Sequence, residues 1–247
     1  LRRMEACTLA RCRRIVVLSE AVRRQVEAFF PRLLPRVAKI PGGVDLQFFN
    51  VHLQPGEARS RLGLPKGVPI ILTIRRLEPR MGLNNLIDAM PEIRAAFPGC
   101  LLLIGGRGSM QDDIRRHIHQ AGLAEAVSLL GFIEEQSLPL WYRAADAFVL
   151  PTRRLEGFGM VILEAVACGL PAVVTPAGAP PEIAGEVDPS LVAAGTAPAD
   201  LARAVIRLLA RADRPALSTQ CRQYAERFSW DSIAQQYERI YSEAIGA

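Results

Sequence analysis

The sequence predicts an α/β fold in which a doubly wound parallel sheet forms one domain, preceded by part of a second domain. Two observations predict it. From about Pro65 onward, short apolar runs alternate with amphipathic helical segments, a pattern typical of βαβ units. The first fifty residues do not continue this series and supply elements for only a fragment of a domain.

The N-terminal fifty residues predict two strands and one helix. Residues 15–18 and 37–40 are strand-sized apolar runs, and Ser19 is a suitable N-cap for a helix over residues 20–30. Two strands and a helix do not make a domain. The polar stretch that follows contains proline, glycine and several charges, so residues 51–65 are predicted to be a linker.

The later apolar runs are short enough to be strands, and the helices between them have recognisable ends. A helix over residues 84–96 closes at Pro98, another over 111–120 closes at Gly122, and Ser137 is expected to cap a third. These helices separate parallel strands as βαβ units require. The predicted strands cover residues 70–74, 101–104, 127–130, 147–150 and 172–174.

The composition excludes several classes of protein. Half of the residues are apolar, yet no apolar run approaches the roughly 20 residues that a membrane-spanning helix needs. The five cysteines are odd in number and form no C-x-x-C pair, which argues against a disulfide framework and a zinc site. The three histidines lack the spacing of a metal cluster. Reduced, mostly buried thiols indicate a cytoplasmic protein.

The formal net charge of +5 comes almost entirely from arginine, since Lys39 and Lys66 are the only lysines. A basic surface could attract nucleic acid, anionic lipid or phosphorylated small molecules. No aromatic residues interleave with the N-terminal arginines, as a single-strand binder requires. Nucleic acid is therefore not an expected partner, whereas peripheral contact with a membrane stays open.

The most informative segment runs from Pro151 to Pro171, with the sequence PTRRLEGFGMVILEAVACGLP. It follows a predicted strand, passes through a glycine-bearing loop and opens a helix that begins near Gly159 and ends before Gly169. Such a helix leaves unbonded backbone N–H groups at residues 158–161, at the carboxyl end of a parallel strand, where open α/β sheets bind ligands. This arrangement suits a diphosphate.

Glu156 and Glu164 flank this helix start. Glu164 stands roughly 7 to 8 Å along the helix at 1.5 Å per residue. One carboxylate can then contact a sugar while the other accepts hydrogen bonds from ribose hydroxyls. Glutamates eight positions apart often arise by chance on helices. Here the flanking glycines, the strand before them and the terminated helix after them favour a binding role.

This run resembles the E-x7-E signature of glycosyltransferase family 4, a large group of retaining, metal-independent GT-B enzymes. Other segments resemble the family's motifs in the same order and spacing, so the resemblance covers nearly the whole chain. They are IPGGVD at 40–45, with Gly42 in place of the family's Asn, LIGGRG at 103–108, GFI at 131–133, TPAGAPPEI at 175–183, and FSW at 228–230 with the helix after it.

The resemblance implies a role for each candidate site residue. Glu156 would contact the donor sugar and Glu164 would bind the ribose. Arg75 or Arg76 would neutralise the leaving diphosphate, since the two are ambiguous by one residue against the family's G-R-L…K-G stretch. The other implied donor-binding residues are Gly106, Arg107, Phe132, Gly157, Phe158, Gly159, Met160 and Val161.

One position departs from the family pattern. Met81 occupies the usual lysine position, and a thioether cannot donate a hydrogen bond to a phosphate. Arg75, Arg76 and Arg80 are close enough in sequence to compensate. The resemblance implies no metal ion and no cofactor, because cationic side chains stabilise the departing diphosphate.

The resemblance also implies a domain organisation. Residues 1–50 would be the end of an N-terminal, acceptor-side domain, residues 66–225 the donor-binding domain, and residues 226–247 a helix that crosses back. The predicted reaction transfers a hexose, with retained anomeric configuration, from a UDP- or GDP-type nucleotide sugar to an acceptor hydroxyl. The acceptor, whether a lipid-linked saccharide, a glycan or a small metabolite, stays open, as does the oligomeric state.

Two other functions stay open. The chain could be a non-catalytic nucleotide-sugar-binding module whose partner chain supplies the other wall of the cleft, a reading that Met81 favours. It could instead be a structural oligomer that pairs through an apolar stripe on its N-terminal helix. That stripe comprises Val22, Val26, Phe29 and Phe30.

Overall fold

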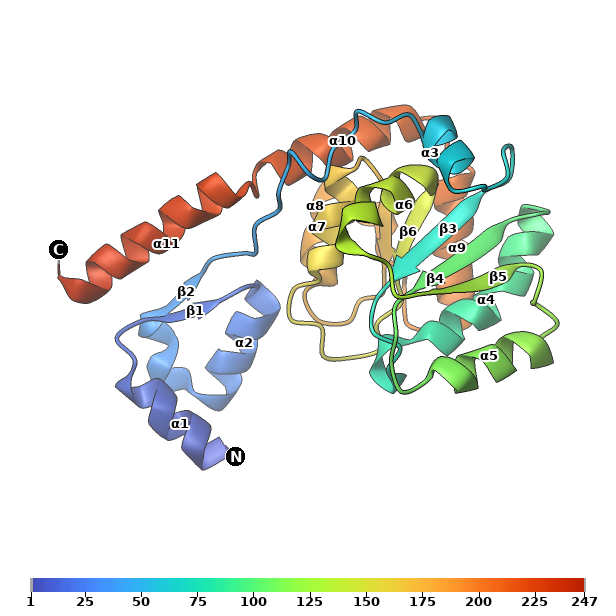
Figure 1. Cartoon of the computed structure of the whole chain (residues 1–247). Coiled ribbons are helices and arrows are strands. Elements are labelled where there is room, and N and C mark those ends of the chain that lie inside the picture. The colour runs from blue at the N-terminus through green and yellow to red at the C-terminus, as the bar shows by residue number, and fades with distance from the viewer. Residues whose placement is uncertain (1, 247) are drawn as a thin grey trace.

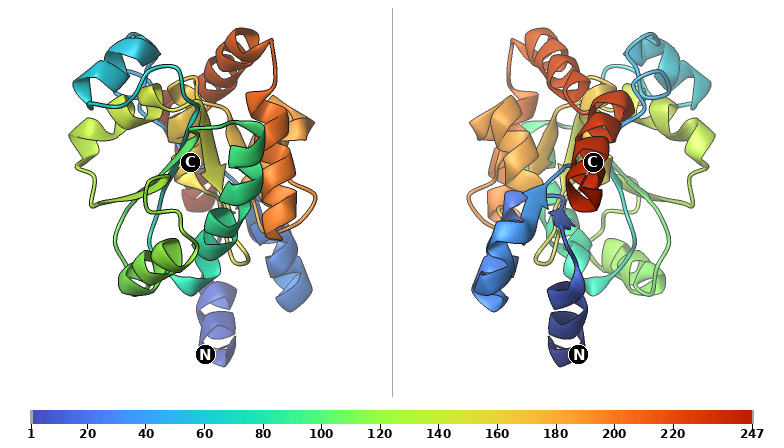
Figure 2. Two further views of the ribbon diagram at one scale, coloured as in Figure 1. Left: turned by 90° about the vertical axis from the view of Figure 1, so that its right-hand side faces the viewer. Right: turned by 90° about the vertical axis from the view of Figure 1, so that its left-hand side faces the viewer.

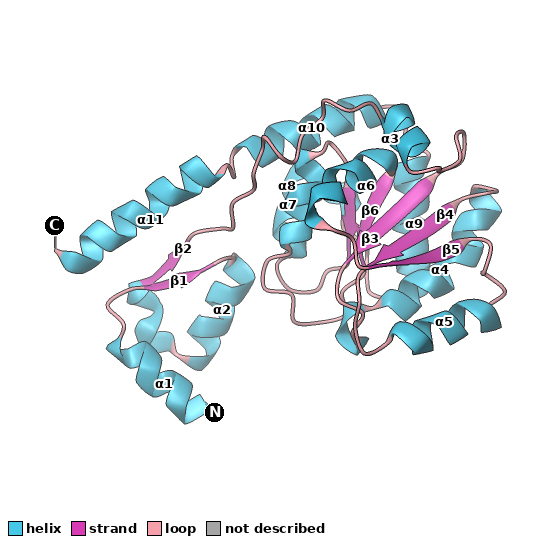
Figure 3. Ribbon diagram, viewed as in Figure 1, coloured by secondary structure: helices cyan, strands magenta, loops and turns pink. Residues whose placement is uncertain are grey.

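A computed structural model of the chain describes residues 2–246, with side chains from residue 7 onward. The C-terminal domain is built on a parallel sheet of five strands in the order β5–β4–β3–β6–β7 (Figure 3). β3 lies at the centre, and its first three residues are fully buried. The strands are β3 (Ile70–Ile74), β4 (Leu101–Gly105), β5 (Val127–Gly131), β6 (Ala147–Leu150) and β7 (Ala172–Val174).

The strand order reverses between β3 and β6. The chain runs outward from β3 through β4 to β5, returns beside β3 with β6, and continues outward to β7. In open α/β sheets, ligands bind in the crevice outside the carboxyl ends of the strands at such a reversal. The loops that follow β3 and β6 are therefore the expected walls of a site.

Helices cover both faces of the sheet, as buried parallel strands require. On one face α4 and α9 pack against each other, and α5 follows α4; α6 and α7 cover the other face, where α10 packs on α7 (Figures 1 and 2). The bounds are α4 (Leu83–Ala96), α5 (Gln111–Gln120), α6 (Leu138–Ala144), α7 (Met160–Ala167), α8 (Pro180–Val187), α9 (Pro198–Leu209) and α10 (Arg214–Glu226). Short 3-10 turns lie at η2 (Pro79–Met81), η3 (Glu135–Ser137) and η4 (Pro189–Leu191).

The strands and the helices at 84–96 and 111–120 are confirmed to within one residue at each end. Ser137 is the exception. It directly precedes α6, but its backbone is already helical, with φ −92° and ψ −13°, and its hydroxyl makes no capping hydrogen bond. The turn η3 leads straight into α6, so the chain never adopts the extended conformation in which a serine caps a helix.

The N-terminal unit is a single βαβ fragment. β1 (Ile15–Val17) pairs in parallel with β2 (Val37–Lys39), and α2 (Glu20–Phe29) and the 3-10 turn η1 (Pro31–Arg36) connect them; α1 (Arg2–Arg11) comes first. Ser19 caps α2 as predicted, since its hydroxyl accepts the amide of Val22 at 3.2 Å. No residue of α2 is fully buried; in the predicted apolar stripe Val22, Val26 and Phe30 are half-buried and Phe29 is 56% exposed.

The start of α2 touches the C-terminal domain directly. The Ser19 hydroxyl donates to the carbonyl of Gly157 at 2.8 Å. The carboxylate of Glu182, in the first turn of α8, accepts the amides of Glu20 at 2.8 Å and Ala21 at 2.6 Å. A side chain of one unit thus satisfies the free amides at a helix start in the other.

A last helix, α11 (Trp230–Ile245), runs from the C-terminal domain back to the N-terminal unit (Figure 1). There Arg13 donates to the carbonyl of Ala244 at 2.6 Å, and Arg14 pairs with Glu243 at 2.7 Å. None of the helices in the described part of the chain is both long and apolar enough to cross a bilayer.

The predicted linker at 51–65 is wrong over much of its length, because α3 (Pro55–Arg61) packs on α6. Arg59 of α3 is buried, donates to the carbonyl of Ala144 at 2.8 Å and pairs with Asp146 at 2.5 Å. Asp146 also accepts the amide of Ile70 at the start of β3, at 2.7 Å. One of the charges that suggested a linker therefore anchors α3 to the sheet.

We expect Asp146→Ala to lower the free energy of unfolding by about 3 kcal/mol, because removal of one partner leaves the guanidinium of Arg59 buried and unpaired. Urea denaturation measures this change. Arg61→Ala is the matched control, since it removes an exposed pair with Glu57 on the same helix and should cost less than about 1 kcal/mol. Equal losses in the two variants would contradict the anchoring role of Asp146.

Candidate functional site

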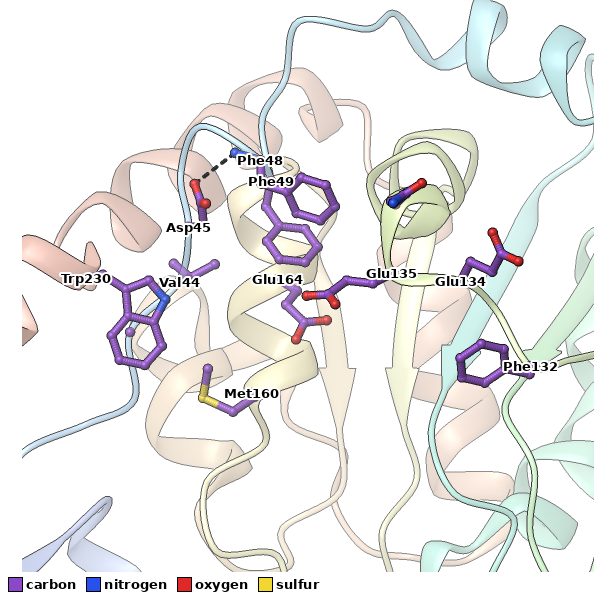
Figure 4. Close-up of a pocket in the computed structure, with 12 residues that line it drawn as sticks. Val44, Asp45, Phe48, Phe49, Phe132, Glu134, Glu135, Met160, Glu164 and Trp230 are labelled. Atoms are coloured by element: carbon purple, nitrogen blue, oxygen red, sulfur yellow. Dashed lines mark hydrogen bonds between the residues drawn. The ribbon is translucent and has the colours of Figure 1, made fainter.

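A pocket of about 680 Å³ opens beside the start of α7 (Figure 4). Its walls come from the segment after β2, the loop after β5, α7 and the start of α11. Aromatic rings and carboxylates predominate among its side chains. The lining residues are Gly43, Val44, Asp45, Phe48, Phe49, Phe132, Glu134, Glu135, Gln136, Met160, Glu164 and Trp230.

Helix α7 begins at Met160, with Gly159 as its N-cap in the left-handed region at φ +91°. Glycine adopts this conformation readily and so lets the chain turn from the loop into the helix. The amide of Ile162 already donates back to the carbonyl of Gly159, at 2.8 Å. The amides of residues 158–161 precede this bond and have no helical partner, so they and the positive end of the helix dipole can receive an anion.

Two glycines after β2 let the chain lie close against this helix start. A Cβ on Gly42 would sit 2.3 Å from the sulfur of Met160, and a Cβ on Gly43 would sit 2.6 Å from the ring of Trp230. An asparagine at position 42 would therefore require the flexible end of the Met160 side chain to shift.

Glu164 lies on the pocket wall, one turn into α7 (Figure 4). Its carboxylate accepts a hydrogen bond from the hydroxyl of Tyr142 at 2.7 Å. Burial raises the pKa of Glu164 above its usual value; the Tyr142 hydrogen bond opposes this rise and the charge of Glu135 adds to it. Tyr142 is fully buried and contacts the rings of Phe49 and Phe148 edge-on. The packed tyrosine thus fixes the orientation of the carboxylate.

Glu156 lies in the loop after β6, where its own loop and two other segments hold it. Its carboxylate accepts hydrogen bonds from Arg75 at 3.1 Å and from the hydroxyl of Thr152 at 3.3 Å. Its carbonyl accepts the amide of Ala179 at 3.0 Å, and a Cβ on Gly178 would lie only 2.2 Å from that carbonyl. The loops after β3, β6 and β7 therefore meet at Glu156.

Arg75 reaches into the site, whereas Arg76 is exposed. Arg75 donates to the hydroxyl of Thr152 at 2.9 Å and pairs with Glu156. Burial lowers the pKa of Arg75 to about 10 and the charge of Glu156 opposes this fall, so the guanidinium stays cationic at neutral pH. Of the two arginines left ambiguous by the sequence, Arg75 has the position from which a charge can act on a ligand beside Glu156.

Met81 is buried, and its sulfur lies 2.6 Å from the guanidinium of Arg75. The position that the resemblance gives to a lysine therefore supports Arg75 instead. Arg80 donates to the carbonyl of Leu155 at 2.7 Å, and its own carbonyl accepts the amide of Arg153 at 2.9 Å. Arg80 thus braces the loop that carries the Glu156 carboxylate.

Gly106, Arg107 and Phe132 come together beyond the carboxyl ends of β4 and β5. Gly106 has φ +125°, and a Cβ there would lie 1.9 Å from the carbonyl of Arg75. The Arg107 guanidinium stacks over the Phe132 ring, 5.4 Å from its centroid, and the ring is 62% exposed. An exposed ring next to a planar cation offers a surface on which a nucleotide base can stack.

Several residues that shape the site were not predicted. Tyr142 stands in an ordinary helical segment, and Thr152 carries no motif that marks it as a ligand of Arg75. Trp230 belongs to a segment that the sequence assigned only to the tail, yet its ring lines the pocket. Only the position of Trp230 had a signal in the sequence. Two consecutive glycines, Gly42 and Gly43, indicate that a bulky side chain packs close against the backbone there.

Known proteins resemble this chain in both sequence and fold. The chain is 32% identical over 204 residues to the GDP-mannose-dependent alpha-(1-6)-phosphatidylinositol monomannoside mannosyltransferase of Mycobacterium tuberculosis, which covers 79% of the chain and 53% of that protein. It is 30% identical over 253 residues to the D-inositol 3-phosphate glycosyltransferase of Acidothermus cellulolyticus, covering 98% of the chain and 55% of that protein. The chain thus spans about half the length of these curated relatives.

Solved structures agree. The sucrose-phosphate synthase of Thermosynechococcus elongatus superposes with a TM-score of 0.84 and 28% identity, covering 99% of the chain and 61% of that protein. Anabaena HepE in complex with UDP-glucose superposes with a TM-score of 0.84 at 22% identity, covering 98% of the chain and 67% of HepE, a likeness of fold alone. The fold is the GT-B-type arrangement that the sequence predicted.

The family assignment rests on most of the chain. A family model described as "Glycosyl transferases group 1" matches residues 56–228, from α3 to the residues before α11. This range includes both glutamates of the site and Arg75. The chain belongs to the group 1 glycosyl transferases.

Proposed function

We propose that this chain is the donor-binding half of a retaining glycosyltransferase of family 4, which transfers a hexose from a nucleoside-diphosphate sugar to an acceptor hydroxyl. The observation that carries the proposal is the pair of carboxylates on either side of the free amides at the start of α7. Glu156 is fixed before the helix by Arg75, and Glu164 is fixed inside it by Tyr142. The names of relatives that use a nucleotide sugar support the same reaction class.

The donor would lie across the start of α7, between Glu164 and Glu156. Its diphosphate would bind the amides of residues 158–161, where the helix dipole favours negative charge. The ribose hydroxyls would donate to Glu164 and the base would stack near Phe132. The hexose would extend toward Glu156.

Arg75 would stabilise the departing diphosphate. A guanidinium in a buried site acts on developing charge far more strongly than in water, and it needs no reorganisation during the reaction. Among the described residues, no three His, Cys, Asp or Glu side chains gather as a metal site would need. From the resemblance to family 4, we also propose that the sugar departs with retained configuration and without a metal ion or cofactor.

The base is proposed to be guanine. Glu134 lines the pocket on the side of Phe132, whereas the carboxylate of Glu135 lies beside Glu164 (Figure 4). Guanine presents two adjacent N–H donors, N1–H and the N2 amino group, which one carboxylate can accept together, whereas uracil presents one donor between two carbonyls. The names of relatives from Mycobacterium tuberculosis and Corynebacterium glutamicum specify GDP-mannose, in agreement with this choice.

The acceptor is proposed to be a hydroxyl of a lipid-linked saccharide, a glycan or a small metabolite. Relatives are named for phosphatidylinositol monomannoside and for D-inositol 3-phosphate. With a lipid-linked acceptor, the enzyme would work in the cytoplasm at the surface of a membrane.

A non-catalytic nucleotide-sugar-binding module is the second candidate, and Met81 is the observation that favours it. The thioether adds no positive charge where the leaving diphosphate would need one. Incubation with GDP-hexose and an acceptor distinguishes the two functions, since an enzyme releases GDP and forms a product of retained configuration, whereas a module returns the donor intact.

Calorimetric titration with GDP, UDP and ADP, each with and without its hexose, tests the proposed donor site. We expect GDP to bind in the micromolar range and more tightly than UDP or ADP. Absence of binding by all three nucleotides would overturn the proposal, and tighter binding of UDP would overturn the choice of base.

Glu156→Gln and Glu164→Gln are expected to affect different ligands. Glu164→Gln removes the ribose-binding carboxylate and should weaken the binding of GDP and of GDP-hexose alike. We expect a loss of about tenfold in each affinity, the value of a hydrogen bond to a charged group. Glu156→Gln should weaken GDP-hexose about tenfold more than it changes GDP, because this carboxylate would contact the sugar. Glu92→Gln, on the exposed side of α4, is the calorimetric control. Equal losses of both ligands in Glu156→Gln would contradict its assignment.

Nucleotide binding should weaken as the pH falls through the pKa of Glu164, because the carboxylate, not the acid, accepts two ribose hydroxyls. Burial raises this pKa, so the loss begins at a higher pH than for an ordinary glutamate. Tyr142→Phe removes the hydrogen bond that lowers the pKa and should move the loss to a still higher pH. Identical profiles of GDP affinity against pH for Tyr142→Phe and the parent chain would contradict this coupling.

A further inference from the structure

A second, smaller pocket lies beside the loop that carries Glu156. It has a volume of about 340 Å³ and is lined by Pro79, Arg80, Arg153, Arg154 and Thr196. It shares no lining residue with the larger pocket. Three of its five lining residues are arginines and none is acidic, so its charge is strongly positive.

None of these three arginines forms an ion pair with a carboxylate of the described chain. Among the described side chains, no carboxylate lies within 4.0 Å of a guanidinium nitrogen of Arg80, Arg153 or Arg154. Glu78, two residues before Arg80, accepts hydrogen bonds from the hydroxyl and the amide of Ser109 at 2.8 and 3.3 Å. The arginines of the pocket therefore form no direct ion pair within the described chain.

The backbone that presents the arginines is firmly held. The amide of Arg153 donates to the carbonyl of Arg80 at 2.9 Å, and Arg80 donates to the carbonyl of Leu155. Gly82 lies so close to the loop after β6 that a Cβ would sit 1.9 Å from the carbonyl of Pro151. The loops after β3 and β6 therefore keep the three arginines on one pocket without help from a ligand.

We propose that Arg80, Arg153 and Arg154 form a phosphate-binding pocket that holds a phosphate group of the acceptor. Guanidinium groups match phosphate oxygens in bidentate geometry, and several unpaired guanidinium groups around one cavity select an anion over a neutral ligand. The Thr196 hydroxyl can add a neutral donor. The assignment to the acceptor rests on the proposed function, in which the donor diphosphate already has its place at residues 158–161.

The position of the pocket supports this assignment. Arg153 and Arg154 precede Glu156 by three and two residues in the same loop, and Arg80 binds the residue just before that glutamate. A ligand anchored there by its phosphate would lie beside the loop that carries Glu156. The acceptor phosphate can belong to a soluble ester or to a lipid headgroup, since the arginines recognise the same oxygens in both.

The test compares Arg153→Gln/Arg154→Gln with a control, Arg115→Gln/Arg203→Gln, which removes the same charge from two exposed arginines on α5 and α9. The full chain is titrated with inorganic phosphate and with glycerol 3-phosphate, and dissociation constants are taken from shifts of the arginine Nε–H resonances. We expect the affinity for both to fall at least tenfold in the pocket variant and less than twofold in the control. Equal affinities in the pocket variant and the control would overturn the pocket.

Vesicles identify the source of the phosphate. Co-sedimentation is measured with phosphatidylcholine vesicles that contain or lack one-fifth phosphatidylinositol. Binding of the phosphatidylinositol vesicles that the pocket variant loses and the control keeps assigns the pocket to a lipid headgroup. Loss of glycerol 3-phosphate binding alone assigns it to a soluble ester.

GDP titration of the same variants separates this proposal from the proposed function. We expect GDP to bind the pocket variant as it binds the control, since neither arginine touches the larger pocket. If the parent chain binds phosphate but not GDP, the proposed donor site is wrong. The phosphate-binding pocket would then be supported, but its assignment to the acceptor would not. GDP binding without phosphate binding would overturn the pocket alone.

Discussion

The ion pair between Arg75 and Glu156 joins the two loops on which the site depends. β3 and β6 are neighbours in the sheet, but the chain leaves them toward helices on opposite faces, so the strand ladder does not hold their loops together. A buried guanidinium is costly without a partner, and Glu156 and Thr152 supply the acceptors that make its burial possible. The same bonds fix the carboxylate that would contact a sugar, so structure and binding share one network.

The parts predicted from the sequence were those with local signals. Strands appeared as short apolar runs, and Gly159 marked the start of α7 because a left-handed turn there favours glycine. Interactions between distant residues could not be predicted. Arg59 stood among polar residues typical of a linker, and its partner Asp146 lies 87 positions away. Nothing near Tyr142 in the sequence indicates that its hydroxyl meets Glu164.

The choice between Arg75 and Arg76 shows a third situation, in which the motif is evident but its register is not. Consecutive side chains at a strand end point to opposite sides, so a shift of one residue exchanges a buried arginine for an exposed one. In the structure Arg75 is the buried residue of the two, and the sulfur of Met81 packs against it. A pattern match alone carries no information on which side of the strand faces the crevice.

The contact of Glu182 with the start of α2 has a consequence for motion between the two units. Its carboxylate accepts two amides that would otherwise be hydrated. If the units move apart, water replaces the carboxylate, and such an exchange changes the free energy by only about 1 kcal/mol for each hydrogen bond. The hydrogen bonds at the start of α2 therefore favour one arrangement of the two units, in which Ser19 contacts Gly157 beside the site. Breaking these hydrogen bonds costs little free energy, so they alone would not hold a bound molecule in place.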